Sequence, residues 1–193
     1  MTADPRLARV LDAVRVRALT PVDDREARSA TAFLEAAAAL DRPFDEHADP
    51  THITASAVVV GDLGVVLLRH KRLGLWLQPG GHIDPGEAPA DAAVREAVEE
   101  TGLAVVLDSP LVIHVDVHAG PKGHTHLDLR YLCHADGDPS PGPGESPDAR
   151  WFTWDEAIAV ADPGLSGLLH SLRPAPFSAQ FSSNIDDNCA ENT

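Results

Sequence analysis

The stretch over residues 81–103 constrains the fold of this chain more than any other part of the sequence. Glycine and proline are frequent at its start, and a run of strong helix formers follows. Pro89 stands near the first turn of that run and Gly102 lies just past its end, which is the usual punctuation of an α-helix. The sequence therefore predicts a loop that leads into a helix over about residues 88–101.

One face of the predicted helix carries three carboxylates. Glu96, Glu99 and Glu100 are spaced i, i+3 and i+4, so they lie together within about one turn. Like charges at this spacing repel each other by roughly 0.2–0.5 kcal/mol, and the negative end of the helix dipole adds to the repulsion. Mg²⁺ or Mn²⁺ would offset it, because these hard cations bind a few carboxylates together with substrate phosphates and waters. The opposite side of the helix is small and aliphatic, and we expect it to face the core: Ala90, Ala93, Val94, Ala97 and Val98.

The order of charged residues and glycines in this segment resembles the Nudix box. The matching residues, in chain order, are Gly81, Glu87, Arg95, Glu96, Glu99, Glu100, Gly102 and the aliphatic Leu103. This set of residues at fixed spacings is far more specific than a lone glycine fingerprint. Ala97 departs from the pattern, since the family usually has a larger aliphatic residue there. A smaller side chain would loosen the packing slightly and leave the acids intact.

The resemblance implies both a fold and a reaction. The fold would be α/β, a Nudix-type α/β/α sandwich with a mixed sheet, here with an N-terminal helical extension. The reaction would be the attack of water on phosphorus in the diphosphate linkage of a nucleoside diphosphate derivative. The chain would then be a pyrophosphohydrolase, a hydrolase acting on acid anhydrides, with Mg²⁺ or Mn²⁺ as its cofactor.

The resemblance also implies which residues hold the metal. Glu96, Glu99 and Glu100 would be ligands, and the backbone carbonyl of Gly80 would complete the site. One of the three glutamates would also take a proton from the attacking water. Catalysis would then rest on positioning and on electrostatic stabilisation of the charge that develops.

Further residues are implied around these ligands. Glu87 and Arg95 would form a supporting shell, because their opposite charges can pair and Arg95 can orient a ligand carboxylate. Glu145 is a candidate catalytic acid, since in many Nudix proteins a loop acid shortly before a late strand reaches the metals or serves as base. Asp148, in the same loop, is a poorer candidate. Exposed acidic loops are common without a catalytic role.

Periodicity and turn residues divide the chain into three parts. We expect an N-terminal helical extension packed on the domain over residues 1–50, a Nudix domain over 51–173, and a mobile polar tail over 174–193. Two helices are expected within residues 5–40, one from Trp154 onward and one around residues 165–172. Irregular loops are expected at residues 78–86 and 135–149. Strands are expected at residues 53–60, 65–69, 103–107, 111–118, 126–134 and 151–153.

Charge and cysteine content indicate which partners and which cellular compartment to expect. The formal net charge of -15, with 15 basic residues against 30 acidic ones, disfavours wrapping a long nucleic acid but allows a small polyanion bound through divalent cations. The first thirty residues carry charges throughout, and no stretch reaches the ~18 apolar residues of a membrane span, so we expect a cytoplasmic protein without a membrane partner. Cys133 and Cys189 lie far apart, which indicates a reducing compartment, and Cys133 looks structural.

Several weaker signals leave alternatives open. Histidines are dense on two predicted strands, around His118 and His126, where they would face substrate or form exposed sheet residues more readily than a transition-metal site. His82, inside the box, is assigned no essential role. The basic cluster over residues 69–72 would either contact substrate phosphates or be solvated, and Trp76 is expected in the core rather than stacked on a base.

Two rival functions remain beside the hydrolase. The first is a binding module of the same fold that senses a nucleotide derivative without turnover, although retention of every box acid weighs against it. The second is another chemistry on the same scaffold, such as isomerisation of a prenyl diphosphate, which would need catalytic residues that the sequence does not reveal. The N-terminal helices would pack on the domain, with a lid or a homodimer contact as alternatives. Neither fold nor box names the substrate.

Overall fold

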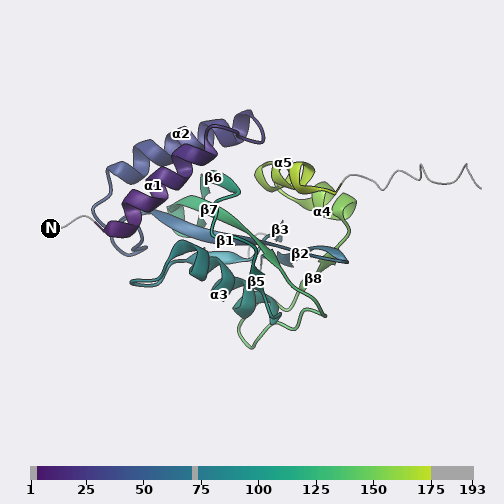
Figure 1. Cartoon of the computed structure of the whole chain (residues 1–193). Coiled ribbons are helices and arrows are strands. Elements are labelled where there is room, and N and C mark those ends of the chain that lie inside the picture. The colour runs from purple at the N-terminus through teal and green to yellow at the C-terminus, as the bar shows by residue number, and fades with distance from the viewer. Residues whose placement is uncertain (1–3, 71–73, 175–193) are drawn as a thin grey trace, which may run out of the picture.

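The chain folds around a mixed β-sheet, seen in a computed structural model that describes residues 4–70 and 74–174 (Figure 1). The α-helices are α1 (Pro5–Arg17), α2 (Asp24–Ala38), α3 (Pro89–Thr101), α4 (Trp154–Val160) and α5 (Pro163–Leu172). The strands are β1 (Thr51–Gly61), β2 (Gly64–Arg69), β3 (Trp76–Leu77), β4 (Gly80–His82), β5 (Val106–Leu107), β6 (His114–Ala119), β7 (Thr125–His134) and β8 (Ala149–Phe152). A short 3₁₀ helix, η1, spans Pro121–Gly123.

The sheet is mixed because β1 and β7 run parallel. The central strand order is β3-β2-β1-β7-β5, while β4 also pairs with β1, β6 with β7 and β8 with β2, all antiparallel. The parallel register places Thr51 beside Thr125 at one end and Val60 beside His134 at the other. The two longest strands, β1 and β7, therefore begin at the same end of the sheet.

Helices cover both faces of the sheet and give it two cores (Figure 1). Strand β2 shows the division, because its side chains alternate between the two cores. Val66 belongs to the core that contains the buried alanines of α3, whereas Val65 and Leu67 belong to the core that contains the leucines of α5. This α/β/α sandwich is the arrangement that the sequence predicts.

The two N-terminal helices cover the edge strand β6. An uncovered edge would expose unpaired backbone amides, and α2 supplies acceptors for two of them. The amide of Val115 donates to Oε1 of Glu26 at 3.1 Å, and the amide of Val117 donates to Oγ of Ser29 at 3.2 Å. Glu26 is fully buried and also accepts two hydrogen bonds of 2.7 Å from Arg17 of α1. The predicted pair of N-terminal helices is confirmed, and the helices pack on the sheet through these bonds.

Three of the predicted segments differ from the structure. The loop predicted over residues 78–86 contains strand β4, whose glycines give no strand signal and which forms only because β1 supplies a partner. The strand predicted over 103–107 shrinks to β5, because Leu103 and Val105 are buried by packing rather than by strand pairing. The strand predicted over 111–118 begins only at His114. Apolar runs of this length do not separate a strand from a buried loop.

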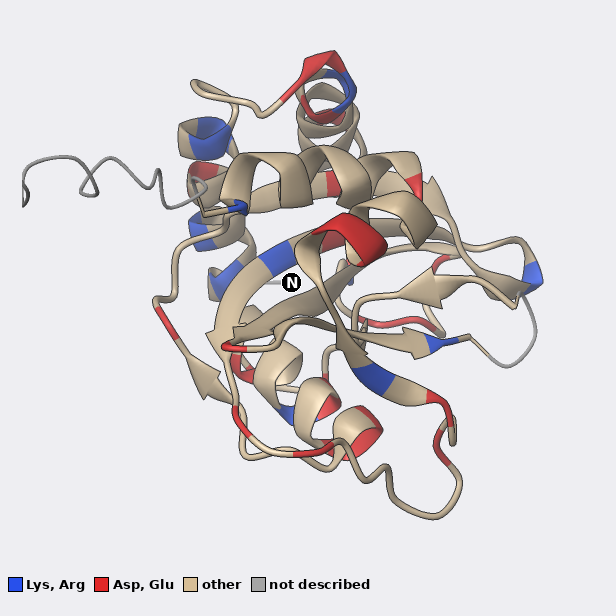
Figure 2. Ribbon diagram, turned by 90° about the vertical axis from the view of Figure 1, so that its right-hand side faces the viewer, with Lys and Arg blue, Asp and Glu red and all other residues tan. Residues whose placement is uncertain are grey.

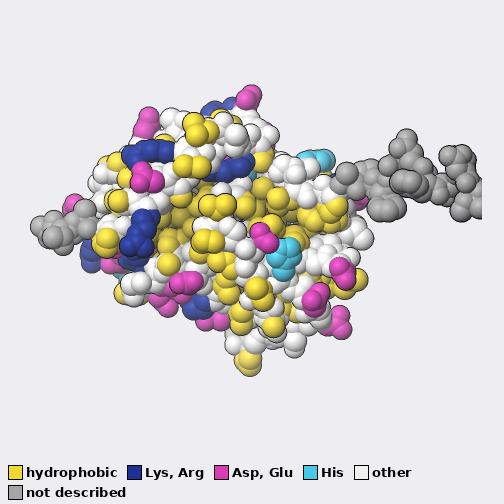
Figure 3. Space-filling model, viewed as in Figure 1, with side chains coloured by type: hydrophobic (Ala, Val, Ile, Leu, Met, Phe, Trp, Pro, Cys, Tyr) yellow, Lys and Arg dark blue, Asp and Glu magenta, His cyan; other side chains and the backbone are white. Residues whose placement is uncertain are grey.

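The surface carries both signs of charge. Figure 2 shows acidic residues towards the end of α3, and on the face shown in Figure 3 the Lys and Arg side chains lie mainly on the side of α1 and α2. In the part of the chain that the structure describes, no helix has the length and hydropathy needed to cross a membrane. The predicted tail over residues 174–193 lies, apart from Pro174, outside the described residues.

Candidate active site

The carboxylates of α3 approach the sheet at the two glycines of β4. The backbone amide of Gly80 donates a hydrogen bond of 2.9 Å to Oε2 of Glu100. A Cβ atom on Gly81 would lie only 2.6 Å from the carboxyl carbon of Glu96, so a larger residue there would displace this carboxylate. Gly81 therefore leaves room for the carboxylate of Glu96 beside β4.

Arg95 connects the acids of this site. Its guanidinium binds Glu87 through two hydrogen bonds of 2.9 Å, from Nε and from Nη2. Its Nη1 donates to Glu96 at 2.8 Å and to Glu99 at 3.3 Å, and its Nη2 also donates to the backbone carbonyl of His82 at 2.9 Å. The hydrogen bonds from Arg95 lower the pKa of Glu87, and those to Glu87 raise the pKa of Arg95. One guanidinium therefore holds three carboxylates beside β4.

The remaining negative charge of the cluster is only partly compensated. Burial raises the pKa of Glu96, although Arg95 works against this shift. Burial also raises the pKa of Glu100, to about 7, and the charges of Glu96, Glu145 and Glu99 act in the same direction. Glu99 is the most open of the three helix acids, with 54% of its side chain exposed. Buried carboxylates that resist ionisation in this way are typical of sites that receive a cation.

The site offers a donor set that fits a hard divalent ion. All the donors are oxygens, from the three helix glutamates and from the backbone at Gly80, and Mg²⁺ and Mn²⁺ prefer such ligands. Burial is the main cause of the raised pKa of Glu100, and the charges of the neighbouring glutamates add to it. The chemistry of the donors and the charge of the site therefore both fit Mg²⁺ or Mn²⁺.

The packing face of α3 is rotated from the predicted one. Ala93 and Ala97 are buried as expected, and Ala90 and Val94 are partly buried, but Val98 is 40% exposed. Glu96 and Glu100 turn towards β4, and the helix rotates with them. The residues of α3 that the structure buries are Pro89, Ala92, Ala93, Ala97 and Thr101.

The two candidate acids of the loop before β8 differ in their distance from the carboxylate cluster of α3. Glu145 lies close enough to the cluster for its charge to raise the pKa of Glu96 and of Glu100. Asp148 instead forms an ion pair of 3.8 Å with Arg69, and both side chains are more than half exposed. Two members of the basic cluster, Lys71 and Arg72, lie outside the described residues. Of the two loop acids, only Glu145 is brought towards the helix acids.

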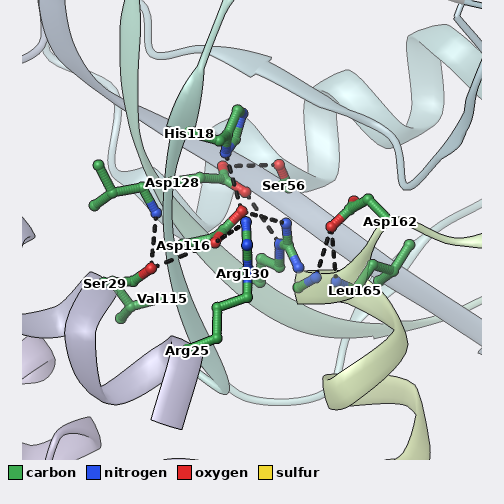
Figure 4. Close-up of polar contacts among 12 residues, drawn as sticks. Arg25, Ser29, Ser56, Val115, Asp116, His118, Asp128, Arg130, Asp162 and Leu165 are labelled. Carbon is green, nitrogen blue, oxygen red and sulfur yellow. Dashed lines mark hydrogen bonds and ion pairs between the residues drawn. The ribbon is translucent and has the colours of Figure 1, made fainter. Parts of the chain in front are cut away.

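The opposite face of β1 carries a buried polar network (Figure 4). Asp128 of β7 accepts hydrogen bonds from Thr54 at 3.0 Å and from Ser56 at 2.8 Å, both on β1. It also accepts one from Nε of Arg130 at 3.2 Å, and Nη2 of Arg130 donates to Asp116 of β6 at 3.3 Å. These carboxylates and the guanidinium are almost completely buried. The network ties the three adjacent strands β1, β7 and β6 together.

Asp116 joins this network to the N-terminal helices. It pairs with Arg25 of α2 at 3.3 Å and accepts a hydrogen bond from Ser29 at 3.4 Å. Nδ1 of His118 lies 3.2 Å from its other oxygen. Although burial opposes ionisation, the hydrogen bond from His118 and the charge of Arg130 lower the pKa of Asp116. The carboxylate is therefore ionised and neutralised within the fold.

Imidazoles gather beyond this network, where β1 and β7 begin. Strand pairing places His126 beside His52 of β1 on one side and beside His118 of β6 on the other. The ring of His52 lies 5.0 Å from that of His82 and 5.1 Å from those of His124 and His126, measured between ring centroids. Burial lowers the pKa of His52, and it lowers that of His126 to about 4. These two rings are thus neutral at pH 7.

Sequence reasoning missed His52 as a functional candidate. The residue lies just before the apolar run predicted as a strand, and β1 begins one residue earlier than His52. The available signal was the alternation of His52, Thr54 and Ser56 along one strand, which places three polar side chains on one face. A polar face on a central strand is costly unless its groups find partners.

Two sequence predictions about packing are confirmed. Trp76 packs on Phe152 with ring centroids 4.8 Å apart. The guanidinium of Arg150 lies 4.6 Å from the ring centroid of Trp76. Cys133 is fully buried in the core beside α3, and burial raises the pKa of its thiol to about 11. Cys189 lies outside the described residues. Neither Trp76 nor Cys133 belongs to a polar site.

The fold and the box now allow a comparison with known families. The chain matches the family model described as NUDIX domain over residues 50–172, which is more than half of its length. The chain therefore belongs to the Nudix family, and the predicted family and fold class are confirmed. The match begins next to the start of β1 and ends at the last residue of α5, so it covers the whole sheet and leaves out α1 and α2.

Individual relatives resemble parts of the chain. "Nucleoside diphosphate-linked moiety X motif 6" of Mus musculus is 38% identical over 88 residues, which are 43% of this chain and 28% of that protein. "ADP-ribose pyrophosphatase" of Methanocaldococcus jannaschii is 31% identical over 75 residues, which are 37% of this chain and 44% of that protein. The chain thus spans less than half of the length of these relatives. The crystal structure of a NUDIX-family hydrolase from Clostridium perfringens aligns with a TM-score of 0.55 and 28% identity, over 63% of this chain and 98% of that one.

Proposed function

We propose that this protein hydrolyses a diphosphate linkage in a nucleoside diphosphate derivative, in a reaction that depends on Mg²⁺ or Mn²⁺. The observation that carries the proposal is the cluster of Glu96, Glu99 and Glu100 on α3, joined by Arg95 and set against the glycines of β4. Membership of the Nudix family supports the reaction class. The names of relatives such as "ADP-ribose pyrophosphatase" support a nucleotide-linked diphosphate as the substrate class.

Each residue of the cluster would have a role in binding the ion or in proton transfer. The three helix glutamates and the carbonyl of Gly80 would hold the ion, which when bound neutralises phosphate charge and acidifies a bound water. Arg95 would orient Glu96 and Glu99, and Glu87 would hold Arg95 through its paired hydrogen bonds. Glu145 would lie on the open side of the cluster as a further acid. The attacking water would lose its proton to one of these carboxylates.

The test is a substrate panel with identification of the products. The purified protein is incubated with nucleoside triphosphates, ADP-ribose, NADH, coenzyme A and dinucleoside polyphosphates, each with Mg²⁺ and with Mn²⁺. We expect hydrolysis at a diphosphate linkage and a rate that rises with pH as metal-bound water ionises. Glu99→Gln should lower the rate by at least roughly 100-fold, because it removes a proposed ligand.

A matched control separates the site from the charge of the helix. Asp91 lies in the first turn of α3 and is exposed, so Asp91→Asn removes the same charge away from the cluster and should leave the rate unchanged. Failure of the wild-type protein to release any product, with Glu99→Gln indistinguishable from it, would overturn the proposal. Tight binding of one compound without turnover would favour the nucleotide-binding module instead.

A further inference from the structure

Three imidazoles converge where β1 and β7 begin, on the face of β1 that α3 does not cover. His52 lies near the start of β1, His126 lies beside it on β7, and His124 lies just before β7. One side-chain nitrogen from each ring lies within 4.8 Å of the other two. The fold thus brings together side chains that are more than seventy residues apart in the sequence.

Two nitrogens of this group lack hydrogen-bond partners among the residues that the structure describes. His52 is completely buried, and its Nδ1 lies 3.3 Å from the carbonyl oxygen of Asp49, so Nδ1 carries the hydrogen and Nε2 carries a lone pair. Within residues 4–70 and 74–174, Nε2 of His52 accepts no hydrogen bond, and Nε2 of His126 is also buried without a partner. Buried polar atoms without partners are uncommon and costly. A hydrogen bond from Nδ1 to a carbonyl is the arrangement that directs Nε2 of a histidine to a metal.

We propose that His52, His124 and His126 form a binding site for a late first-row divalent ion, with Zn²⁺ as the principal candidate. Imidazole nitrogens without thiolates or a carboxylate select Zn²⁺, Ni²⁺ or Cu²⁺ over Mg²⁺. Three histidines leave a fourth tetrahedral position for water or for His82, whose ring is the neighbour of His52 on the side of β4.

The geometry requires a small inward movement of the rings. Zn²⁺–N bonds of about 2.0–2.1 Å place the nitrogens of a tetrahedral site roughly 3.3 Å apart, which is closer than the 4.8 Å limit of this group. His124 precedes the strand and is only partly buried, so its ring has room to turn. His52 and His126 are fixed by strand pairing and form the rigid part of the site.

This site is distinct from the carboxylate cluster of α3 in position and in chemistry. Glu96 and Glu100 lie on the other side of β1 and offer only oxygens, whereas this site offers only nitrogens. Strand β4 lies between the two sites: the ring of His82 neighbours that of His52, and the carbonyl of His82 accepts a hydrogen bond from Arg95. An ion held by the three histidines would stabilise the junction of β1, β4 and β7.

Equilibrium dialysis of the full chain against Zn²⁺ tests the proposal. Millimolar Mg²⁺ is present throughout to occupy the carboxylates, and bound zinc is measured by atomic absorption. We expect one zinc per chain in the wild-type protein and an affinity lowered by at least roughly 100-fold in His124→Ala and in His126→Asn. His134→Ala is the matched control, because its exposed ring pairs with Asp108 away from the site, and its affinity should equal that of the wild-type protein.

Each remaining result decides the question. If His126→Asn fails to fold, His124→Ala decides alone, since its partly exposed ring lies outside the strand, and circular dichroism confirms its fold. With Co²⁺ in place of zinc, the wild-type protein should show visible absorption bands of a tetrahedral nitrogen site that His124→Ala lacks. Absence of bound zinc in the wild-type protein, or wild-type zinc affinity in both histidine variants, would overturn the proposal. Loss of zinc in Glu99→Gln would also overturn it by placing the ion on α3, and none of these readings depends on turnover.

Discussion

Carboxylates are buried on both sides of β1, and their pKa values are shifted in opposite directions on the two sides. On the side of α3, Glu96 and Glu100 share Arg95 with other acids, and burial raises the pKa of both glutamates. On the other side, Asp116 is buried even more completely than these glutamates, but His118 and Arg130 lower its pKa. Burial alone raises the pKa of a carboxylate, so the direction of the net shift reports whether its partners outweigh burial.

This contrast separates a structural network from the proposed cation site. The Asp116 network is closed within the fold, since its carboxylates meet two guanidiniums and three hydroxyl groups. The α3 cluster has one guanidinium for several carboxylates and stays open, with Glu99 half exposed. Removing an acid should therefore cost stability on the first face and activity on the second.

The largest expected effect on stability is on the closed network. Asp128→Ala leaves the guanidinium of Arg130 buried with fewer partners and removes the acceptor for Thr54 and Ser56. We expect a loss of about 3–5 kcal/mol in the free energy of unfolding, measured with urea. Asp148→Ala is the control, because this exposed acid forms only a 3.8 Å ion pair, and its change should stay within about 0.5 kcal/mol. Equal losses in the two variants would remove the distinction between closed and open acids.

The pH dependence of stability should report the buried histidine of the same face. Burial and the charge of Arg130 lower the pKa of His114 from 6.5 to about 4. Between pH 4 and pH 6.5 the unfolded chain binds the proton of His114 more readily than the folded protein does. The free energy of unfolding therefore increases as the pH rises through this range and decreases as the pH falls. The contribution is on the order of 2–3 kcal/mol between pH 4 and pH 7.

His114→Gln removes this titration and should flatten the pH profile of unfolding. Urea unfolding at several pH values measures the slope in the wild-type protein and in the variant. His170→Gln, at an exposed position on α5, is the control and should keep the wild-type slope. A profile of His114→Gln as steep as the wild-type profile would show that other groups control the acid sensitivity.

The smallest expected effect on stability is on the open cluster. Without divalent ions and at pH 5, Glu100→Gln should stabilise the protein slightly, by roughly 0.5 kcal/mol, because it relieves repulsion within α3. Since the pKa of Glu100 is raised to about 7, the folded form holds the proton more tightly, and the wild-type protein loses stability as pH rises from 4.5 through 7. The gain from the variant should thus be larger at pH 8 than at pH 5. A large loss of thermal stability would mean that Glu100 is structural.

The carboxylate cluster could be predicted because its members are close in the sequence. Glu96, Glu99 and Glu100 fall within one helical turn, and the helix needs only local signals such as Pro89 and Gly102 to be located. Their depth in the fold could not be predicted in the same way. Val98 was expected in the core and is exposed, because the rotation of α3 depends on β4, a strand that forms only through its pairing with β1.

The sequence by itself determined the family, the helix α3 and the residues that we propose as ligands of a hard cation. These features rest on short-range spacing, which the helix repeat converts directly into geometry. Only the tertiary structure decided that His52 meets His124 and His126 and that Asp128 meets Thr54. It also decided that the carboxylates of α3 and the imidazoles lie on opposite faces of β1. Those contacts arise from the parallel pairing of β1 with β7, whose register joins residues more than seventy positions apart.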